Sequence, residues 1–320
     1  MSDFDRRMAT FVLLILVLVI LIFYFSPLLD GIALGIVFAY VARPIMKRIP
    51  IKRKGPSAIL ATIAVVAPIS LILIFSLYDL GLWAMSEWES AFEMIVVAFQ
   101  QLPEPLQGFL EILPTGMGRE FLTVDRASSI IMLILNFLLS TLLCYYLLVD
   151  GKKVAEFMTD LFHVEDKGLV ATCDNAISGI YIGSVYTAFI VAVMTVPFLL
   201  IFRIPHPLAI LGLMFLAALI PVLAEWMILL IPLAHLVLRE APLTLSMTFI
   251  ITGSIFLYIL PELVIRPWLT GRRGRIHPFL MLLAFIGGGI SGGVAGFFLA
   301  PMFAGILVTV YRSRKTDDRI

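Results

Sequence analysis

The segment Leu208–Leu238 reads LAILGLMFLAALIPVLAEWMILLIPLAHLVL, an apolar stretch of 31 residues with Pro221 near its middle. A helix that crosses a membrane needs about 17 to 25 mostly apolar residues. The proline breaks the helical pattern and leaves arms of about 13 and 17 residues, which are short for two crossings. The segment therefore predicts a helical hairpin that dips into a bilayer and returns, although two full crossings would fit the same pattern of charges.

The rest of the chain has the composition of a membrane protein. Of its 320 residues, 61% are hydrophobic and 14% are charged, whereas soluble domains contain about 45–50% and 25%. The net charge of +1 and the lack of a basic stripe argue against nucleic acid as a partner. Two cysteines in unrelated contexts predict neither a disulfide framework nor a metal site. We expect an all-α integral membrane protein that is surrounded by lipid and holds no cofactor.

Six other apolar segments are long enough to span the bilayer. Basic residues, among them Arg43, Lys47 and Arg48, follow the second of these segments within twelve positions of its end. The positive-inside rule places this loop in the cytoplasm, and with it both termini of a multi-pass plasma membrane protein. The predicted spans are Ala9–Phe25, Pro27–Ala42, Ser57–Leu82, Ser128–Val149, Ala176–Phe202 and Pro242–Ile265.

A second interrupted apolar stretch runs from Pro278 to Tyr311. It contains five clustered glycines and starts and ends beside basic residues, so it enters from the cytoplasmic side, opposite to Leu208–Leu238. Interrupted segments that enter from opposite sides are typical of substrate sites in secondary transporters. Alternatively, the glycines only permit close helix packing. The glycines are Gly287, Gly288, Gly289, Gly292 and Gly293.

Two amphipathic segments are predicted outside the spans. From Met85 to Leu102, apolar residues recur every three or four positions, which lines one face of a helix on the outer side. This face packs on the protein's own membrane domain, on the lipid interface or on another subunit. Between Asp150 and Asp174, mixed charges with one apolar face predict a helix lying along the cytoplasmic surface of the membrane.

Glu225 and the preceding Pro221 are candidates for residues on a solute or ion pathway. Glu225 follows the break at Pro221, and a carboxylate at membrane depth is costly enough to suggest a function. In a full crossing it would instead be a solvated or paired group. Glu262 and Arg266 are also candidates for the pathway. They lie four residues apart, a spacing that alternatively suits a structural ion pair, and Pro267 is expected to end that helix.

Other candidate residues have simpler alternatives. His277 precedes the second interrupted stretch and is either a titratable gate or a capping residue. Asp150 and Gly151 are expected to form the turn that ends a span. Motifs of metalloproteases, serine hydrolases and nucleotide-binding loops are missing from the sequence, so we do not expect an enzyme.

The segments divide the chain into four parts. Residues 1–56 form a helical hairpin and the basic loop, and 57–149 hold two spans around an outer region at 83–127. Residues 150–175 form the cytoplasmic amphipathic segment. Residues 176–320 form the transport core, with the interrupted segments 208–238 and 278–311.

Four stretches resemble the autoinducer-2 exporter family of PerM-like permeases. They are SPLLDGIALGIVFAYVARPIMKRI from Ser26, YYLLVDGKK from Tyr145, LGLMFLAALIP from Leu211 and RPWLTGRRGRIHPFLMLLAFIGGGISGGVAGFFLAP from Arg266. The resemblance implies a helical transporter, forming a homo-oligomer such as a pentamer, that exports small hydrophilic signals or exchanges Na⁺ for H⁺.

The chain departs from the family pattern after Pro221. The family usually has a glycine there, with a proline two or three residues further on, whereas this chain reads Val-Leu-Ala-Glu. The family's substrate is therefore not carried over to this chain. Three hypotheses follow from the sequence: a permease for a small polar solute, a Na⁺/H⁺ antiporter, and a membrane scaffold that assembles without transporting.

Overall fold

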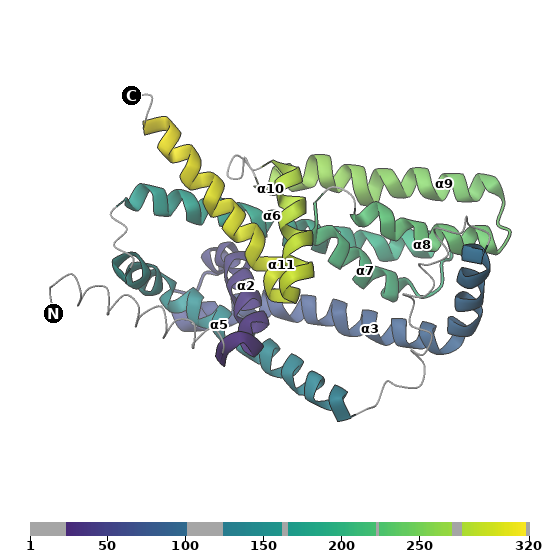
Figure 1. Ribbon diagram of the computed structural model, residues 1–320, viewed down its shortest axis with the longest axis horizontal. Coiled ribbons are helices and arrows are strands. Elements are labelled where there is room, and N and C mark those ends of the chain that lie inside the picture. Colours follow the sequence, from purple (N-terminus) through teal and green to yellow (C-terminus); the bar gives the residue numbers. More distant parts are fainter. Residues whose placement is uncertain (1–23, 101–123, 162–165, 222–223, 271–276, 318–320) are drawn as a thin grey trace, which may run out of the picture.

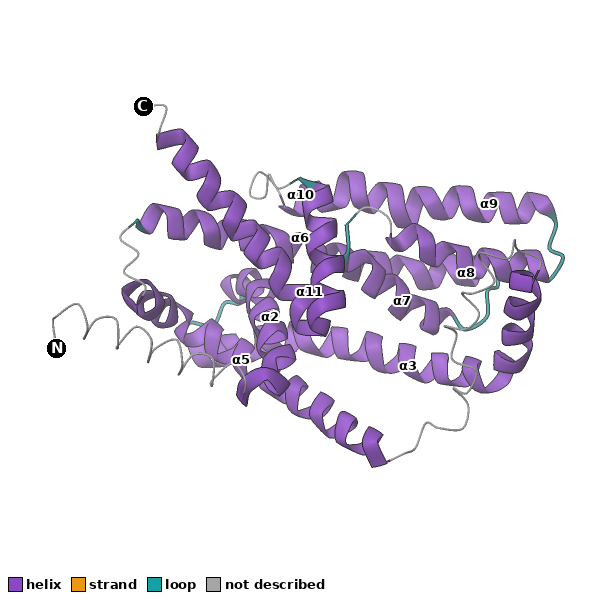
Figure 2. Cartoon of the chain, in the orientation of Figure 1, coloured by secondary structure: helices purple, strands orange, loops and turns teal. Residues whose placement is uncertain are grey.

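The computed structural model describes residues 24–100, 124–161, 166–221, 224–270 and 277–317, and within these ranges it contains helices and no strands. The predicted all-α architecture is confirmed (Figures 1 and 2). The elements in chain order are η1 (Ser26–Leu28), α2 (Leu29–Arg48), α3 (Lys54–Gln100), α5 (Val124–Leu161), α6 (Lys167–Ile201), α7 (Pro207–Leu219), α8 (Ala224–Leu238), α9 (Leu243–Gly253), η3 (Ser254–Ile259), η4 (Pro261–Ile265), α10 (Arg266–Thr270) and α11 (Pro278–Asp317).

Six stretches of helix in the described part are long and apolar enough to cross a membrane. Five of them overlap a predicted span, with ends that differ from the prediction, and the sixth contains the interrupted stretch near the C-terminus. The predicted span at Ala9–Phe25 lies almost wholly outside the described residues. Large apolar side chains such as Ile63, Ile74 and Leu133 are exposed, as a lipid environment requires. The stretches are Ser26–Arg48, Lys54–Trp83, Ile131–Leu161, Lys167–Ile201, Leu243–Thr270 and Pro278–Ser313.

Helix α6 lies at the centre of the molecule and packs against α2, α7, α10 and α11. Its inward faces carry small or β-branched side chains, including the fully buried Ala188, Val191 and Ala192. Small side chains let neighbouring helices approach closely, which is the usual source of helix packing in lipid. This helix is therefore the support on which the interrupted elements rest.

The segment Leu208–Leu238 forms a hairpin of two short helices, α7 and α8. At a rise of 1.5 Å per residue, their 13 and 15 residues extend about 20 and 22 Å, less than the roughly 30 Å of a hydrocarbon core. Figure 1 shows α7 and α8 alongside α3 and α9, with the turns at 202–206 and 239–242 at the same end of the molecule. The segment is thus a helical hairpin with its turn near Pro221, and its two ends lie at the same end of the molecule.

The second interrupted stretch folds back on itself inside α11. Only Gly292 (φ −135°, ψ 20°) and Gly293 (φ 56°, ψ −141°) leave the helical conformation, and the second of these needs a residue without a side chain. The two arms cross at Gly288 and Gly296, where a Cβ on either residue would collide with the carbonyl oxygen of the other. Gly292 and Gly293 therefore make the turn, whereas Gly288 and Gly296 permit close packing of the two arms.

Parts of both predicted amphipathic segments belong to longer helices, α3 and α5. Helix α3 extends to Gln100, so the start of the predicted outer helix is part of it, but the side chains of that stripe lie outside the described residues. The expected turn at Asp150 and Gly151 is wrong, because α5 continues through both residues to Leu161. The residues that follow are mostly good helix formers, and one glycine costs a helix only about 1 kcal/mol.

Candidate functional site

The break between α7 and α8 lies in the protein interior. Ile220 leaves the helix in an extended conformation, Pro221 follows it and is buried, and α8 begins at Ala224. The last carbonyl groups of a helix have no partner within the helix. One of them, the carbonyl oxygen of Ala218, accepts a hydrogen bond of 2.8 Å from Nη2 of Arg266. A cation at this end of a helix also interacts favourably with the helix dipole.

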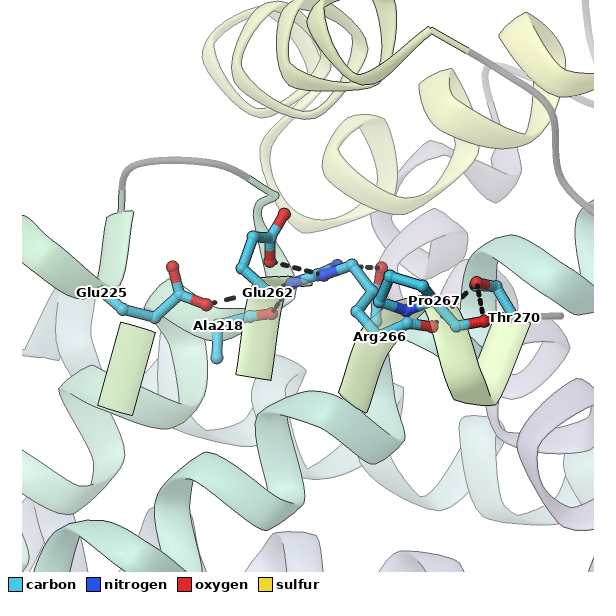
Figure 3. A network of polar contacts seen from close by, with 7 residues as sticks. Ala218, Glu225, Glu262, Arg266, Pro267 and Thr270 are labelled. Carbon is cyan, nitrogen blue, oxygen red and sulfur yellow. Dashed lines mark hydrogen bonds and ion pairs between the residues drawn. The ribbon is translucent and has the colours of Figure 1, made fainter. Parts of the chain in front are cut away.

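Arg266 is held by side chains from two further elements (Figure 3). Its Nε donates to Oε2 of Glu262 at 2.7 Å, which is the predicted ion pair, and its Nη1 donates to Oγ of Ser184 on α6 at 3.3 Å. The guanidinium group thereby joins α6, α7 and η4. With its side chain only 12% exposed, it is a buried charge with several hydrogen bonds, the arrangement in which a buried charge is tolerated.

The helix that carries Arg266 is irregular. Residues 254–259 and 261–265 are π-helical, and such turns are frequent at functional sites. The expectation that Pro267 ends this helix is wrong, because α10 continues to Thr270. Pro267 lies inside a helix that is continuous from Leu243 to Thr270, shortly after the π-helical residues 261–265. The hydroxyl of Thr270 donates to the Arg266 carbonyl at 2.7 Å.

Glu225 completes the cluster from the first turn of α8. Its side chain is 0% exposed, and neither carboxyl oxygen has a hydrogen-bond partner among the described residues. Nη2 of Arg266 lies 3.9 Å from its Oε1, and Figure 3 marks this ion pair with a dashed line. Two carboxyl groups therefore share one arginine. A buried carboxylate without hydrogen bonds is costly, so Glu225 is the group in this cluster that packing alone does not explain.

The opposite end of α7 is also held by a charged side chain. Oδ2 of Asp79, on α3, accepts hydrogen bonds of 3.0 Å from the backbone N–H groups of Leu208 and Ala209, and its Oδ1 lies 2.9 Å from Nδ1 of His206. Sequence reasoning missed Asp79, although it is the one charged residue in the apolar run from Ser57 to Leu82. Helix α7 thus has a carboxylate at its N-terminus and a guanidinium at its C-terminus, both complementary to its dipole.

The break in α11 has a carboxylate beside it as well. Oδ1 of Asp30, in the first turn of α2, accepts a hydrogen bond of 2.7 Å from the N–H of Ala295, where the second arm begins. The next residue, Gly31, donates its N–H to Oδ1 of Asn136 on α5 at 2.7 Å. Sequence reasoning missed both contacts, because they join residues more than 100 positions apart.

The remaining predicted residues lie apart from the Arg266 cluster. His277 caps α11, since its Nδ1 accepts from the N–H of Phe279 at 3.3 Å, and it is exposed. Arg43 links α2 to α6 through Asp174, with Nη1–Oδ distances of 2.8 and 3.0 Å. Lys47 and Arg48 form the last turn of α2. The structure thus brings together Glu225, Glu262 and Arg266, with Pro221 in the break between α7 and α8, and the glycines of α11 form a separate feature.

Known proteins match this chain over nearly its whole length. The model of the AI-2E family transporter matches residues 11–314. A proposed transport protein of Archaeoglobus fulgidus is 33% identical, over 94% of this chain and 93% of its own length. Similar proteins from Methanocaldococcus jannaschii and Methanothermobacter thermautotrophicus, with the same description, are 25% and 28% identical over 95% and 84% of the chain, and over 95% and 83% of their own lengths. This helical membrane protein therefore belongs to the AI-2E family of transporters.

Proposed function

We propose that the protein is a permease that moves a small polar solute, such as a signalling molecule, along a path past the break between α7 and α8. The observation that carries this proposal is the fully buried carboxyl group of Glu225, which has no hydrogen-bond partner among the residues that the structure describes and lies 3.9 Å from Arg266. Polar groups of both signs at an interrupted helix suit the recognition of a polar solute. Ile220 and the π-helical turns that precede Arg266 have backbone that deviates from regular α-helix.

A second candidate is exchange of a cation for protons. If both carboxyl groups are ionised, Glu225 and Glu262 carry two negative charges against the one positive charge of Arg266. A site with one surplus negative charge suits Na⁺ or H⁺, whereas an uncharged solute needs no such surplus. This candidate uses the same residues and predicts that adding Na⁺ outside acidified vesicles dissipates the pH gradient.

We further propose that the protein resides in the plasma membrane with both termini in the cytoplasm, and that it forms a homo-oligomer such as a pentamer. The distribution of Lys and Arg along the sequence supports the orientation. Figure 1 agrees with it, since the start of α6 and the end of α11 lie opposite the turns at 202–206 and 239–242. The exposed apolar side chains of α3 and α5 offer surface for lipid or for a second copy.

Flux into liposomes tests the function. The purified full-length chain is reconstituted, and uptake is measured for a panel of labelled hydroxylated signals, amino acids and organic acids, with pH and Na⁺ gradients imposed separately. The permease proposal expects protein-dependent uptake of at least one organic solute. Dissipation of the pH gradient by Na⁺ without uptake of any organic solute favours the antiporter. A lack of any protein-dependent flux would leave the scaffold hypothesis and contradict both transport proposals.

A further inference from the structure

Few buried polar atoms in the described part of the chain lack a hydrogen-bond partner. Among the described residues there are four such side-chain oxygens: both carboxyl oxygens of Glu225, the hydroxyl of Thr187 and the hydroxyl of Ser246. Buried polar groups in proteins almost always have a partner, which can be a side chain, the backbone, a water or a ligand. Ser246 lies on α9, away from the Arg266 cluster. The oxygens of Glu225 and Thr187 are therefore the ones to consider for binding a solute.

Thr187 faces the Arg266 cluster from α6. Residues at positions i, i+3 and i+4 share one face of a helix, so Thr187 lies on the same face as Gly183 and Ser184. The hydroxyl of Ser184 binds Arg266 at 3.3 Å, and a Cβ on Gly183 would collide with Thr270 and lie 4.0 Å from Cγ of Arg266. Thr187 is fully buried one turn further along this face, about 4.5 Å along the helix axis from Ser184.

The hydroxyl of Thr187 differs from those of other threonines in the membrane helices. A threonine in a helix commonly donates its hydroxyl to the carbonyl three or four residues earlier. Thr195, two turns further along α6 and equally buried, donates to the carbonyl of Val191 at 2.8 Å. Thr270 likewise donates to the carbonyl of Arg266 at 2.7 Å. Thr187 makes no such bond, so its hydroxyl is available to a partner from outside its own helix.

The charges of the cluster define what the carboxyl group of Glu225 can bind. Oε2 of Glu262 lies 2.7 Å from Nε of Arg266, so these two side chains compensate each other. Glu225 is a second carboxyl group beside the same guanidinium, at 3.9 Å. With both carboxyl groups ionised, the cluster has one negative charge more than positive charges. A buried charge is tolerated when it is paired and hydrogen-bonded. A solute that pairs with Glu225 therefore brings a positive charge and hydrogen-bond donors.

A primary ammonium group meets both requirements. It carries one positive charge and three N–H donors and has no acceptor. Hydrogen bonds from such a group to a carboxylate are about twice as strong as those between neutral groups. A metal ion is a poorer match, because hard cations are bound by about six or more oxygens. In addition, no trio of His, Cys, Asp and Glu side chains among the described residues is placed to hold a metal ion.

We propose that the permease accepts solutes with a primary ammonium group, which donates to the carboxylate of Glu225, and that the hydroxyl of Thr187 binds a second polar group of the same solute. The proposal rests on the proposed function, because the solute reaches these oxygens past the break between α7 and α8. A neutral or anionic solute of the same shape leaves the carboxylate of Glu225 unpaired and binds more weakly.

Thermal unfolding of the full-length protein in detergent measures binding without transport. The protein is heated with each member of three matched pairs: glucosamine and glucose, ethanolamine and ethylene glycol, and putrescine and 1,4-butanediol. A ligand that binds only the folded state raises the unfolding temperature. We expect at least one amine to raise it by about 2 °C or more, and its uncharged counterpart to leave it unchanged. No rise with any of the amines, or equal rises within every pair, would overturn the proposal.

Three variants assign the effect to the two side chains. Glu225→Gln keeps the shape and removes the charge, so the rise with the amine should disappear. Thr187→Val should increase the amine concentration that gives half of the rise about twofold to tenfold, the usual worth of one hydrogen bond. Thr195→Val, at the threonine whose hydroxyl is already bonded, should bind as the wild type does.

The two site variants remove no hydrogen bond to a described residue, so both should fold. An undiminished rise in Glu225→Gln would overturn the ammonium site. Equal responses of Thr187→Val and Thr195→Val would overturn the role of Thr187.

Binding and flux fail independently. If amines bind as described but no solute crosses the membrane, the ammonium site stands and the permease is wrong. If neutral solutes cross and no amine binds, the permease stands and the ammonium site is wrong. Stabilisation by Na⁺ but by none of the amines also overturns the ammonium site and favours the antiporter.

Discussion

At the scale of single residues, the cluster combines one group that stabilises the fold with one that does not. Arg266 satisfies a carbonyl, a carboxylate and a hydroxyl from three elements. Glu225 makes no hydrogen bond to any described residue, and its one charged contact is Arg266 at 3.9 Å. Replacing a buried, poorly paired charge by an apolar residue of similar size is often neutral or stabilising. Stability and transport should therefore respond in opposite ways to the loss of this carboxyl group.

We predict that Glu225→Leu leaves the thermal unfolding temperature unchanged or raises it, while transport falls at least tenfold. The variant removes the cost of burying a carboxyl group but also removes the charge that we assign to the pathway. Thermal unfolding in detergent and flux in liposomes measure the two effects. A loss of stability greater than about 2 kcal/mol would show that Glu225 is a structural partner of Arg266.

For Asp79, in contrast to Glu225, we predict that loss of the carboxylate lowers the stability of the fold. Asp79→Ala removes three contacts from the N-terminal end of α7, and we expect a loss of about 1–2 kcal/mol, typical of a missing helix cap. Asp79→Asn keeps one acceptor oxygen and should lose less. The free energy of unfolding, measured by denaturant titration in detergent, checks the order wild type, Asn, Ala. Equal stability of all three would mean that Asp79 does not hold α7.

At the scale of elements, the positions of the helix breaks can be predicted from the sequence, but the side chains that bind the helix ends cannot. Proline lacks an N–H and glycine accepts a positive φ, so Pro221 and Gly293 mark breaks that local chemistry imposes. Asp79 and Asp30 reach helix ends more than 120 positions away, and no local pattern identifies their partners. The end of α5 was misplaced because Gly151 suggested a turn, while the residues after it sustain the helix.

The crossing of the two arms of α11 gives a prediction with a matched control. An alanine at Gly288 would collide with Gly296, so Gly288→Ala should destabilise the protein by about 1–3 kcal/mol, the usual cost of overpacking. Gly287, one position earlier, has open space around its Cβ position, and Gly287→Ala should be neutral or slightly stabilising. Thermal unfolding of both variants checks this contrast. Similar effects at both positions would contradict the crossing.

At the scale of the whole molecule, the sequence predicted the membrane fold and the family, because both depend on long apolar segments and on motifs that need no tertiary information. The family assignment rests on a match over residues 11–314. The sequence predicts part of the candidate site, namely Glu225, Glu262 and Arg266. The hydrogen bonds of Arg266 to Ala218 and Ser184 are visible only in the structure. His277 and the glycines of α11, which the sequence also suggests, lie outside the Arg266 cluster.

If both ends of the α7–α8 hairpin lie on the outer side of the membrane, as the positive-inside rule predicts, the accessibility of three positions follows. Single cysteines at Arg203 and Arg239, in a background where Cys144 and Cys173 are serine, should react with an impermeant thiol reagent from the same side of oriented vesicles. A cysteine at Lys52 should react from the opposite side. Labelling of positions 203 and 239 from opposite sides would mean that the segment between them crosses the membrane an odd number of times.

The most direct test of the central claim, that solute passes the break beside Glu225, is the initial rate of solute uptake into liposomes by the wild type, Glu225→Gln and Glu156→Gln at equal protein content. We expect the exposed Glu156→Gln control to match the wild type and the buried Glu225→Gln to lose at least nine-tenths of the rate. A Glu225→Gln rate equal to that of the wild type would contradict the account.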